Sequence, residues 1–126
     1  MRRPALVIGG LCIAMLASPS FAQISEDALR RAQAQVDGIL ASAKKIAIYC
    51  EWVAATELSL DAIRAGDQTA LTAYNAKANA AFAKLGPTHR EAHQTYGLSY
   101  WQGDQRAKPL HDAWARLDAS CRPVTQ

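Results

Sequence analysis

The fold of this chain is decided by residues 29–60, which read LRRAQAQVDGILASAKKIAIYCEWVAATELSL. Apolar residues recur there in steps of three and four, the spacing that places side chains on one stripe of an α-helix. One column of this heptad pattern is Leu29, Val36, Ala43 and Cys50, and the other is Ala32, Ile39, Ile46, Val53 and Leu60. Such a stripe must be buried, so we expect the rest of the chain to supply helices that cover it.

A second apolar stripe lies roughly opposite the heptad pattern in the second half of this region. It consists of Ile48, Trp52, Ala55 and Ala62. A helix that is apolar on two faces is typical of a central helix with neighbours on both sides. The alternative is that the stripe around Trp52 is an exposed surface for a partner.

Capping residues set the limits of the first helical region. Ser25 is a good N-cap, and Gly66 suits the left-handed residue that ends a helix. One unbroken helix of this length would be long for so small a chain. Two shorter helices are therefore the alternative, with Gly38 as the expected break.

Three further signals predict the later helices. Asp67 can cap a second helical region, and Thr88 and Glu91 have the spacing of a capping box that starts a third. Asp104 can cap the last helix, unless Pro109 marks its start. Because short turns make successive helices antiparallel neighbours, the sequence predicts an all-α fold. We expect a small up-and-down bundle of three or four antiparallel helices.

The first residues have the pattern of a signal peptide. Two arginines precede an apolar run over residues 5–17, and Ala22 ends a segment of small residues that suits cleavage. The run is too short to span a membrane, so we expect no membrane span after cleavage. We predict a cleaved signal peptide at 1–22, a single helical-bundle domain at 23–126, and a periplasmic or secreted protein.

The charge balance argues against two classes of partner. The chain has 14 basic and 11 acidic residues, and cleavage would remove Arg2 and Arg3, leaving 12 against 11. A nearly neutral protein offers no reason to expect binding to nucleic acid or to an anionic membrane surface.

Cys50 and Cys121 are the two cysteines outside the predicted signal peptide, and each lies on the apolar seam of its helix. Because exported proteins meet an oxidising compartment, we predict that they form a disulfide. The alternative is two buried thiols that pack as small apolar residues. Their wide separation excludes a CxxC redox motif.

His89 and His93 stand at positions i and i+4 of a predicted helix, so they share a face and could hold one metal ion jointly. A third ligand would have to come from His111 and Asp112, or from Glu57. The same spacing also arises by chance on amphipathic helices, where the histidines pack between helices or face water. We predict no resident cofactor.

Aromatic residues gather near one end of the predicted bundle. They are Tyr96, Tyr100, Trp101 and Trp114. Tyrosine and tryptophan anchor interfaces well, so Tyr96, Tyr100 and Trp101 are candidate partner-binding residues. Packing into the core is the commoner role for such residues. The segment 97–103, between two glycines, is expected to be the least regular part of the chain.

Two function classes are left. The first is a small exported, non-enzymatic binding module, such as an inhibitor, a chaperone, an immunity-type protein or an envelope adaptor. It would bind another protein or a small ligand in the export compartment. The second is a metal- or cofactor-binding bundle centred on His89 and His93. No catalytic residue is predicted, because Ser99 has no nucleophile motif around it. The heptad would equally serve a homodimer.

Overall fold

The structure is a computed structural model that describes residues 23–122, so the predicted signal peptide lies outside the described residues. Its elements are α2 (Glu26–Leu40), α3 (Ala43–Ala65), α4 (Gln68–Lys84), α5 (Pro87–Gln102), the 3-10 turn η2 (Gln105–Ala107) and α6 (Lys108–Ala119). The all-α class is confirmed across this part of the chain. None of these helices is both long enough and apolar enough to cross a membrane.

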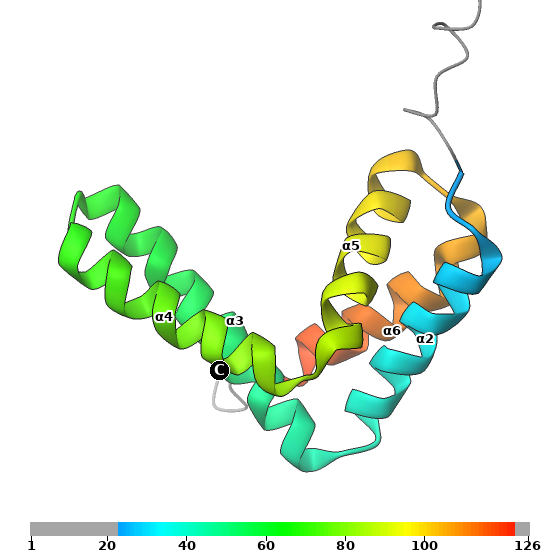
Figure 1. The fold of residues 1–126 in the computed structure, drawn as a ribbon, viewed down its shortest axis with the longest axis horizontal. Coiled ribbons are helices and arrows are strands. Elements are labelled where there is room, and N and C mark those ends of the chain that lie inside the picture. The colour runs from blue at the N-terminus through cyan, green and yellow to red at the C-terminus, as the bar shows by residue number, and fades with distance from the viewer. Residues whose placement is uncertain (1–22, 123–126) are drawn as a thin grey trace, which may run out of the picture.

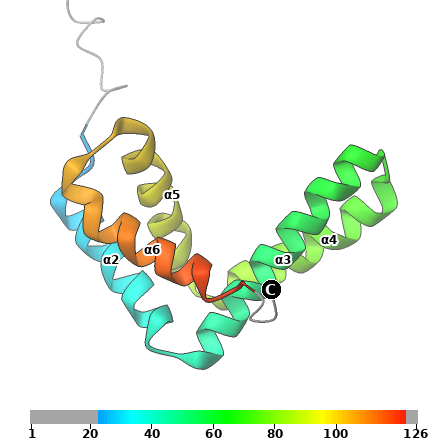
Figure 2. The same cartoon turned by 180° about the vertical axis from the view of Figure 1, so that it is seen from behind.

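The helices form two arms that meet in a V (Figure 1, Figure 2). One arm contains α2, α5 and α6, and the other is a hairpin of α3 and α4. This arrangement differs from the expected single up-and-down bundle of three or four helices. The α3–α4 hairpin extends away from the other three helices instead of packing along them.

Small side chains explain why the hairpin needs no third helix along its length. Beyond Tyr49 at the base of α3, its buried residues are Ala55, Ser59 and Ala62 on α3, and Ala78 and Ala81 on α4. Two faces of small residues let helices approach closely, and each helix covers the narrow apolar stripe of the other. The side chain of Leu60, the last member of the heptad pattern, is left 47% exposed.

The second apolar stripe of α3 is therefore the one that the hairpin buries. Trp52 lies half-buried against Phe82 of α4, with ring centroids 5.7 Å apart. The stripe is an interface within the chain, as expected for a central helix. The alternative, a stripe left exposed for a partner, is wrong for Ala55 and Ala62, which are buried, whereas Trp52 keeps part of its surface exposed.

The first helical region is divided into two helices, and the break lies after Gly38. Gly38 is inside α2, which ends at Leu40. Ser42 then caps α3, because its side chain accepts a hydrogen bond from the backbone N–H of Lys45 at 3.2 Å. Ser25 caps α2 and Gly66 ends α3 in the left-handed conformation, both as predicted.

The expected capping box at the start of α5 is not formed. The helix begins at Pro87, so Thr88 lies inside it. The hydroxyl of Thr88 donates to Gln35 Oε1 at 2.7 Å, and Glu91 accepts from Arg31 Nε at 2.7 Å. Both side chains therefore bind α2 instead of the backbone at the start of their own helix. They connect α5 to α2.

The segment 97–103 is more regular than expected. Helix α5 continues through Gly97 to Gln102, and Gly103 ends it with a φ of +64°. Asp104 then caps η2, and α6 starts at Lys108 with a proline in its first turn. A glycine inside a helix, such as Gly97, lowers the helix propensity but does not end the helix. Among residues 23–122, no atom from outside its own helix lies within 4 Å of the position that a Cβ would take at Gly97.

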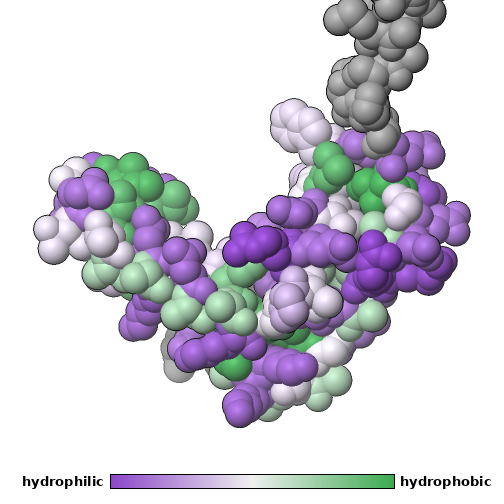
Figure 3. Space-filling model, viewed as in Figure 1, coloured by the Kyte–Doolittle hydropathy of each residue, from purple (hydrophilic) through white to green (hydrophobic). Residues whose placement is uncertain are grey.

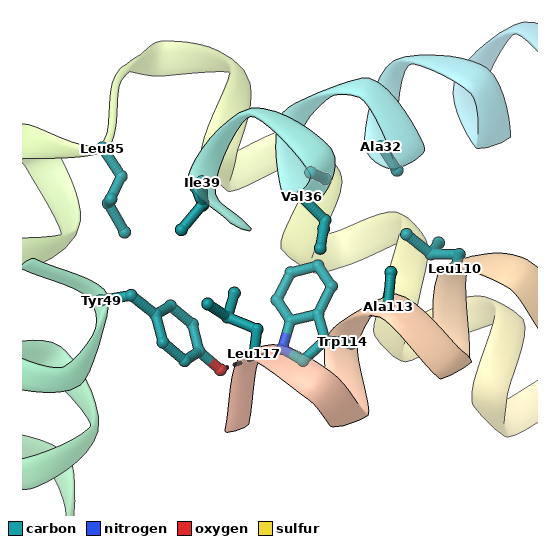
Figure 4. Packing of buried hydrophobic residues seen from close by; sticks show 10 residues of the cluster. Ala32, Val36, Ile39, Tyr49, Leu85, Leu110, Ala113, Trp114 and Leu117 are labelled. Atoms are coloured by element: carbon teal, nitrogen blue, oxygen red, sulfur yellow. Dashed lines mark hydrogen bonds between the residues drawn. The ribbon is translucent and has the colours of Figure 1, made fainter. Parts of the chain in front are cut away.

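The main core lies between α2, α5, α6 and the first part of α3 (Figure 4). Its buried members include Ala32, Val36, Ile39, Tyr49, Leu85, Ala92, Leu110, Ala113, Trp114 and Leu117. The predicted heptad positions in α2 are therefore core positions. Trp114 is the largest of them, with only 2% of its surface exposed.

The predicted disulfide is confirmed, because Cys50 and Cys121 are bonded, with Cα atoms 5.2 Å apart. Cys50 belongs to α3 and Cys121 follows the end of α6. The bond therefore joins the hairpin arm to the three-helix arm at the point where they meet.

Replacing both cysteines, as Cys50→Ala with Cys121→Ala, should lower the free energy of unfolding by about 4 kcal/mol, because the bond closes a loop spanning 71 positions of sequence. Urea denaturation of the oxidised protein and the double variant measures this difference. Dithiothreitol should shift the wild-type midpoint and leave that of the double variant unchanged. An unchanged wild-type midpoint would show that the bond adds no stability.

Candidate functional site: a groove between the two arms

A groove of about 690 Å³ lies where the two arms meet. Its walls come from α3, from α5 and from the end of α6. The lining residues are Tyr49, Cys50, Trp52, Val53, Ala54, Thr56, Glu57, His93, Tyr96, Trp114, Asp118, Cys121 and Arg122. Rings and aliphatic groups thus form most of the wall, and a few polar side chains from different helices face the same space.

Helix periodicity explains which side chains reach the groove. Val53 and Glu57 stand one turn apart on α3, on the heptad face that the hairpin leaves uncovered. His93 and Tyr96 stand on one face of α5 in the same way. Glu57, which interrupts the heptad pattern in the sequence, therefore has a place: it puts a carboxylate at the groove.

A chain of hydrogen bonds fixes the end of the groove formed by α6. Trp114 Nε1 donates to the hydroxyl of Tyr49 at 3.0 Å, and that hydroxyl donates to Asp118 Oδ1 at 2.6 Å. Figure 4 shows Trp114 and Tyr49 pointing toward one another from α6 and α3. Burial raises the pKa of Tyr49 far above its usual value, and the hydrogen bond to Asp118 raises it further. Tyr49 therefore stays protonated and orients the Asp118 carboxylate.

Stacked rings build the floor beside this chain. Tyr96 stacks on Trp114 with ring centroids 4.4 Å apart and planes within 14°. Trp52 meets His93 edge to face at 5.4 Å. Burial raises the pKa of Tyr96, and the negative charge of Asp118 adds to the effect. The electrostatic field of Asp118 therefore reaches the groove wall.

The two histidines singled out in the sequence have different surroundings. His89 is completely buried, and its Nδ1 lies 3.4 Å from Gln35 Nε2. Since Gln35 presents a donor there, the proton of neutral His89 is on Nε2, which has no hydrogen-bond partner among residues 23–122. Burial, with a smaller contribution from His93, lowers the pKa of His89 to about 4. Burial also lowers the pKa of His93, so both rings are neutral at pH 7.

The rings of His89 and His93 are 6.4 Å apart, centroid to centroid. Within the described chain, no group of three or more His, Cys, Asp or Glu side chains is placed to hold a metal ion. His111 is engaged elsewhere, with its Nε2 2.8 Å from Ser99 Oγ. The metal hypothesis thus stays a prediction, and residues 23–122 bring no third ligand to it.

The predicted partner-binding residues are divided between two places. Tyr96 is half-buried in the groove wall, whereas Tyr100 and Trp101 are 68% and 88% exposed. Core packing, the commoner role, is therefore correct for Trp114 and wrong for Tyr100 and Trp101. Other large exposed apolar residues are Leu58, Leu60 and Ile63 on α3 and Leu98 on α5. Figure 3 shows an apolar patch over the outer part of the hairpin.

The pair of Ser99 and His111 was missed in the sequence. Ser99 also bonds to the backbone oxygen of Tyr96 at 2.8 Å, so its single proton goes there and His111 donates to it. Ser99 is completely buried, which places its hydroxyl out of reach of a ligand. The pair connects α5 to α6 and is structural.

Tyr49 and Asp118 were missed as site residues, although the sequence carries a signal for them. Tyr49 precedes Cys50, and Asp118 stands nearly one turn before Cys121. A disulfide between the two cysteines brings their helical neighbours together. The predicted disulfide could therefore have predicted this contact.

Comparisons with protein-family models, with curated proteins and with solved structures found no match to this chain. The geometry and charges of the groove are therefore the basis for assigning it a role.

The stability of the protein should fall as the pH drops from 6.5 to 4 because of His89. Its pKa is about 4 in the folded chain, against about 6.5 when unfolded, so in this range only the unfolded state takes up the proton. The stability that neutral His89 contributes is fully present above pH 6.5. About 3 kcal/mol of it should be lost by pH 4. Urea denaturation over this range should show a smaller loss in His89→Leu; parallel curves would contradict the prediction.

Removing the hydroxyl of Tyr49 should destabilise the junction between the arms. Tyr49→Phe leaves the buried Trp114 Nε1 without its acceptor and frees Asp118, for a loss of about 1–3 kcal/mol. Tyr74→Phe is the matched control, because the Tyr74 hydroxyl forms no hydrogen bond within residues 23–122. Thermal and urea unfolding of both variants measures the difference, and equal effects would argue against a special role for Tyr49.

Proposed function

We propose that this protein is a small non-enzymatic binding module of an export compartment, and that the groove between its arms holds a small organic ligand. The observation that carries this proposal is the groove itself. Its volume of about 690 Å³ lies within the range of about 300–1,000 Å³ that is usual for small-molecule sites.

The composition of the walls supports a ligand with an apolar body. Trp52, Val53 and Tyr96 offer ring faces and aliphatic surface, and all three are half-buried. Thr56 and Glu57 add polar groups from α3. Ligand sites generally combine a mostly apolar lining with a few polar groups that set the ligand's orientation.

The fixed geometry of the walls supports binding without large rearrangement. The Cys50–Cys121 bond joins the walls formed by α3 and the end of α6 covalently, and the hydrogen bond from Tyr49 to Asp118 joins the same two walls. A site that is already ordered loses less conformational freedom when a ligand enters, which favours affinity.

The state of the candidate catalytic groups favours binding over catalysis. Ser99 is completely buried and does not line the groove, although it is bonded to His111. His93 reaches the groove as a neutral ring packed against Trp52. Neither residue is paired with an accessible nucleophile in the described part of the chain.

Export remains part of the proposal, supported by two observations. A disulfide between residues on different helices is typical of proteins in oxidising compartments. The pattern of residues 1–22 predicts a signal peptide.

Indole tests the groove as a ligand site, because it is a small ring with little polarity. Titration into ¹⁵N-labelled protein should shift the amide signals of residues that line the groove, such as Val53, Glu57 and Tyr96. Ala54→Trp, at an exposed lining position, should weaken indole binding by about tenfold by filling the space. Ala47→Trp, exposed one heptad earlier and outside the groove, should leave it unchanged.

Two outcomes would count against the groove. Signals that do not move with indole would mean that the groove takes no such ligand. Shifts confined to residues 98–101, and lost in Trp101→Ala, would place binding at the exposed end of α5 instead.

A further inference from the structure

We propose that the ligand of the groove is an organic cation, an ammonium or guanidinium group on an apolar body, held between the carboxylates of Glu57 and Asp118 and the rings of Trp52 and Tyr96. This inference rests on the proposed function, since it names the chemical class of the ligand for the same groove.

The two carboxylates come from different helices and line one space. Glu57 belongs to α3 and Asp118 to α6. The ion pairs formed within residues 23–122 join other side chains, and neither Glu57 nor Asp118 takes part in one. Two carboxylates without a cationic partner in one groove favour a positively charged ligand.

Asp118 is held in place at the groove by a hydrogen bond. The protonated hydroxyl of Tyr49 donates a hydrogen bond of 2.6 Å to Oδ1 of the carboxylate. Oδ1 is therefore occupied, and the second oxygen is available to a ligand.

The rings supply the second element of cation recognition. Trp52 and Tyr96 line the groove, and the face of an aromatic ring attracts a cation through its quadrupole, tryptophan most strongly. His93, whose imidazole also lines the groove, is neutral at pH 7 because burial lowers its pKa. It therefore adds no positive charge that would oppose a cation.

Arg122 is the opposing charge, because it also lines the groove, next to Cys121. It forms no ion pair with Glu57 or Asp118 in the described chain. Two carboxylates still outnumber one guanidinium, so the net charge of the lining is negative. Arg122 defines the competing interpretation, an anion site, which the experiment has to separate from a cation site.

Three probes with the same phenyl body separate charge from apolar contact. They are phenethylammonium, 2-phenylethanol and 3-phenylpropionate, titrated into the mature, oxidised protein at pH 7 and low salt with NMR detection. Phenethylammonium should bind about fivefold more tightly than the alcohol, and phenylpropionate more weakly than either. Raising the salt concentration should narrow this difference, because salt screens exposed charges.

Charge-removing variants identify the groups responsible. Glu57→Gln should weaken phenethylammonium binding by about threefold and leave the alcohol unaffected, since Glu57 is exposed and forms no ion pair within the described chain. Glu51→Gln is the matched control, an exposed glutamate of the same helix outside the groove. Arg122→Gln should strengthen binding of the cation.

The same cationic group could be carried by a free amine or by a basic side chain of a peptide. A comparison of acetyl-Lys-Phe-amide with phenethylammonium separates these sources. Tighter binding of either compound than of the other supports the inference, provided that Glu57→Gln weakens that binding. Equal affinity for all three phenyl probes would overturn the inference and leave the groove as a ligand site. Tighter binding of phenylpropionate than of phenethylammonium, lost in Arg122→Gln, would also overturn the inference. If none of the probes bound, the proposed function would be contradicted as well.

Discussion

The junction between α3 and the end of α6 is the constraint on which the rest of the structure depends. The hairpin of α3 and α4 packs mainly on itself, through small side chains that bury little area. Its connection to the other arm is therefore concentrated at the base of α3, where Cys50 is bonded to Cys121 and Tyr49 bonds to Asp118. Because the groove walls come from both arms, the junction that joins the arms also shapes the groove.

The same junction sets the electrostatics of the groove. Tyr49 is buried among apolar neighbours, yet its hydroxyl accepts a hydrogen bond from Trp114 and donates one to Asp118, so its own polar group and the indole N–H of Trp114 both have partners. The hydrogen bond that Tyr49 donates holds the Asp118 carboxylate at the wall. Burial keeps the nearby imidazoles of His89 and His93 neutral. The groove is consequently negative, which is the physical basis for the inferred preference for a cation.

Local sequence signals predicted much of the secondary structure because they act within one helical turn. Ser25, Gly66 and Asp67 cap or end helices where the sequence places them. The signals failed where a distant partner competes for the same side chain. Thr88 and Glu91 have the spacing of a capping box, but Gln35 and Arg31 of α2 bind them instead. A local sequence pattern cannot predict such partners, because they are distant in the sequence.

By itself, the sequence determined the all-α class, most helix ends and the pairing of Cys50 with Cys121, since capping, periodicity and cysteine placement on apolar seams are local properties. Only the tertiary structure decided which face of α3 is buried. Its two apolar stripes are similar in the sequence, and the choice depends on the packing of α4 along α3, which leaves Ala55 and Ala62 buried. That choice left the heptad face around Val53 open, and the groove follows from it.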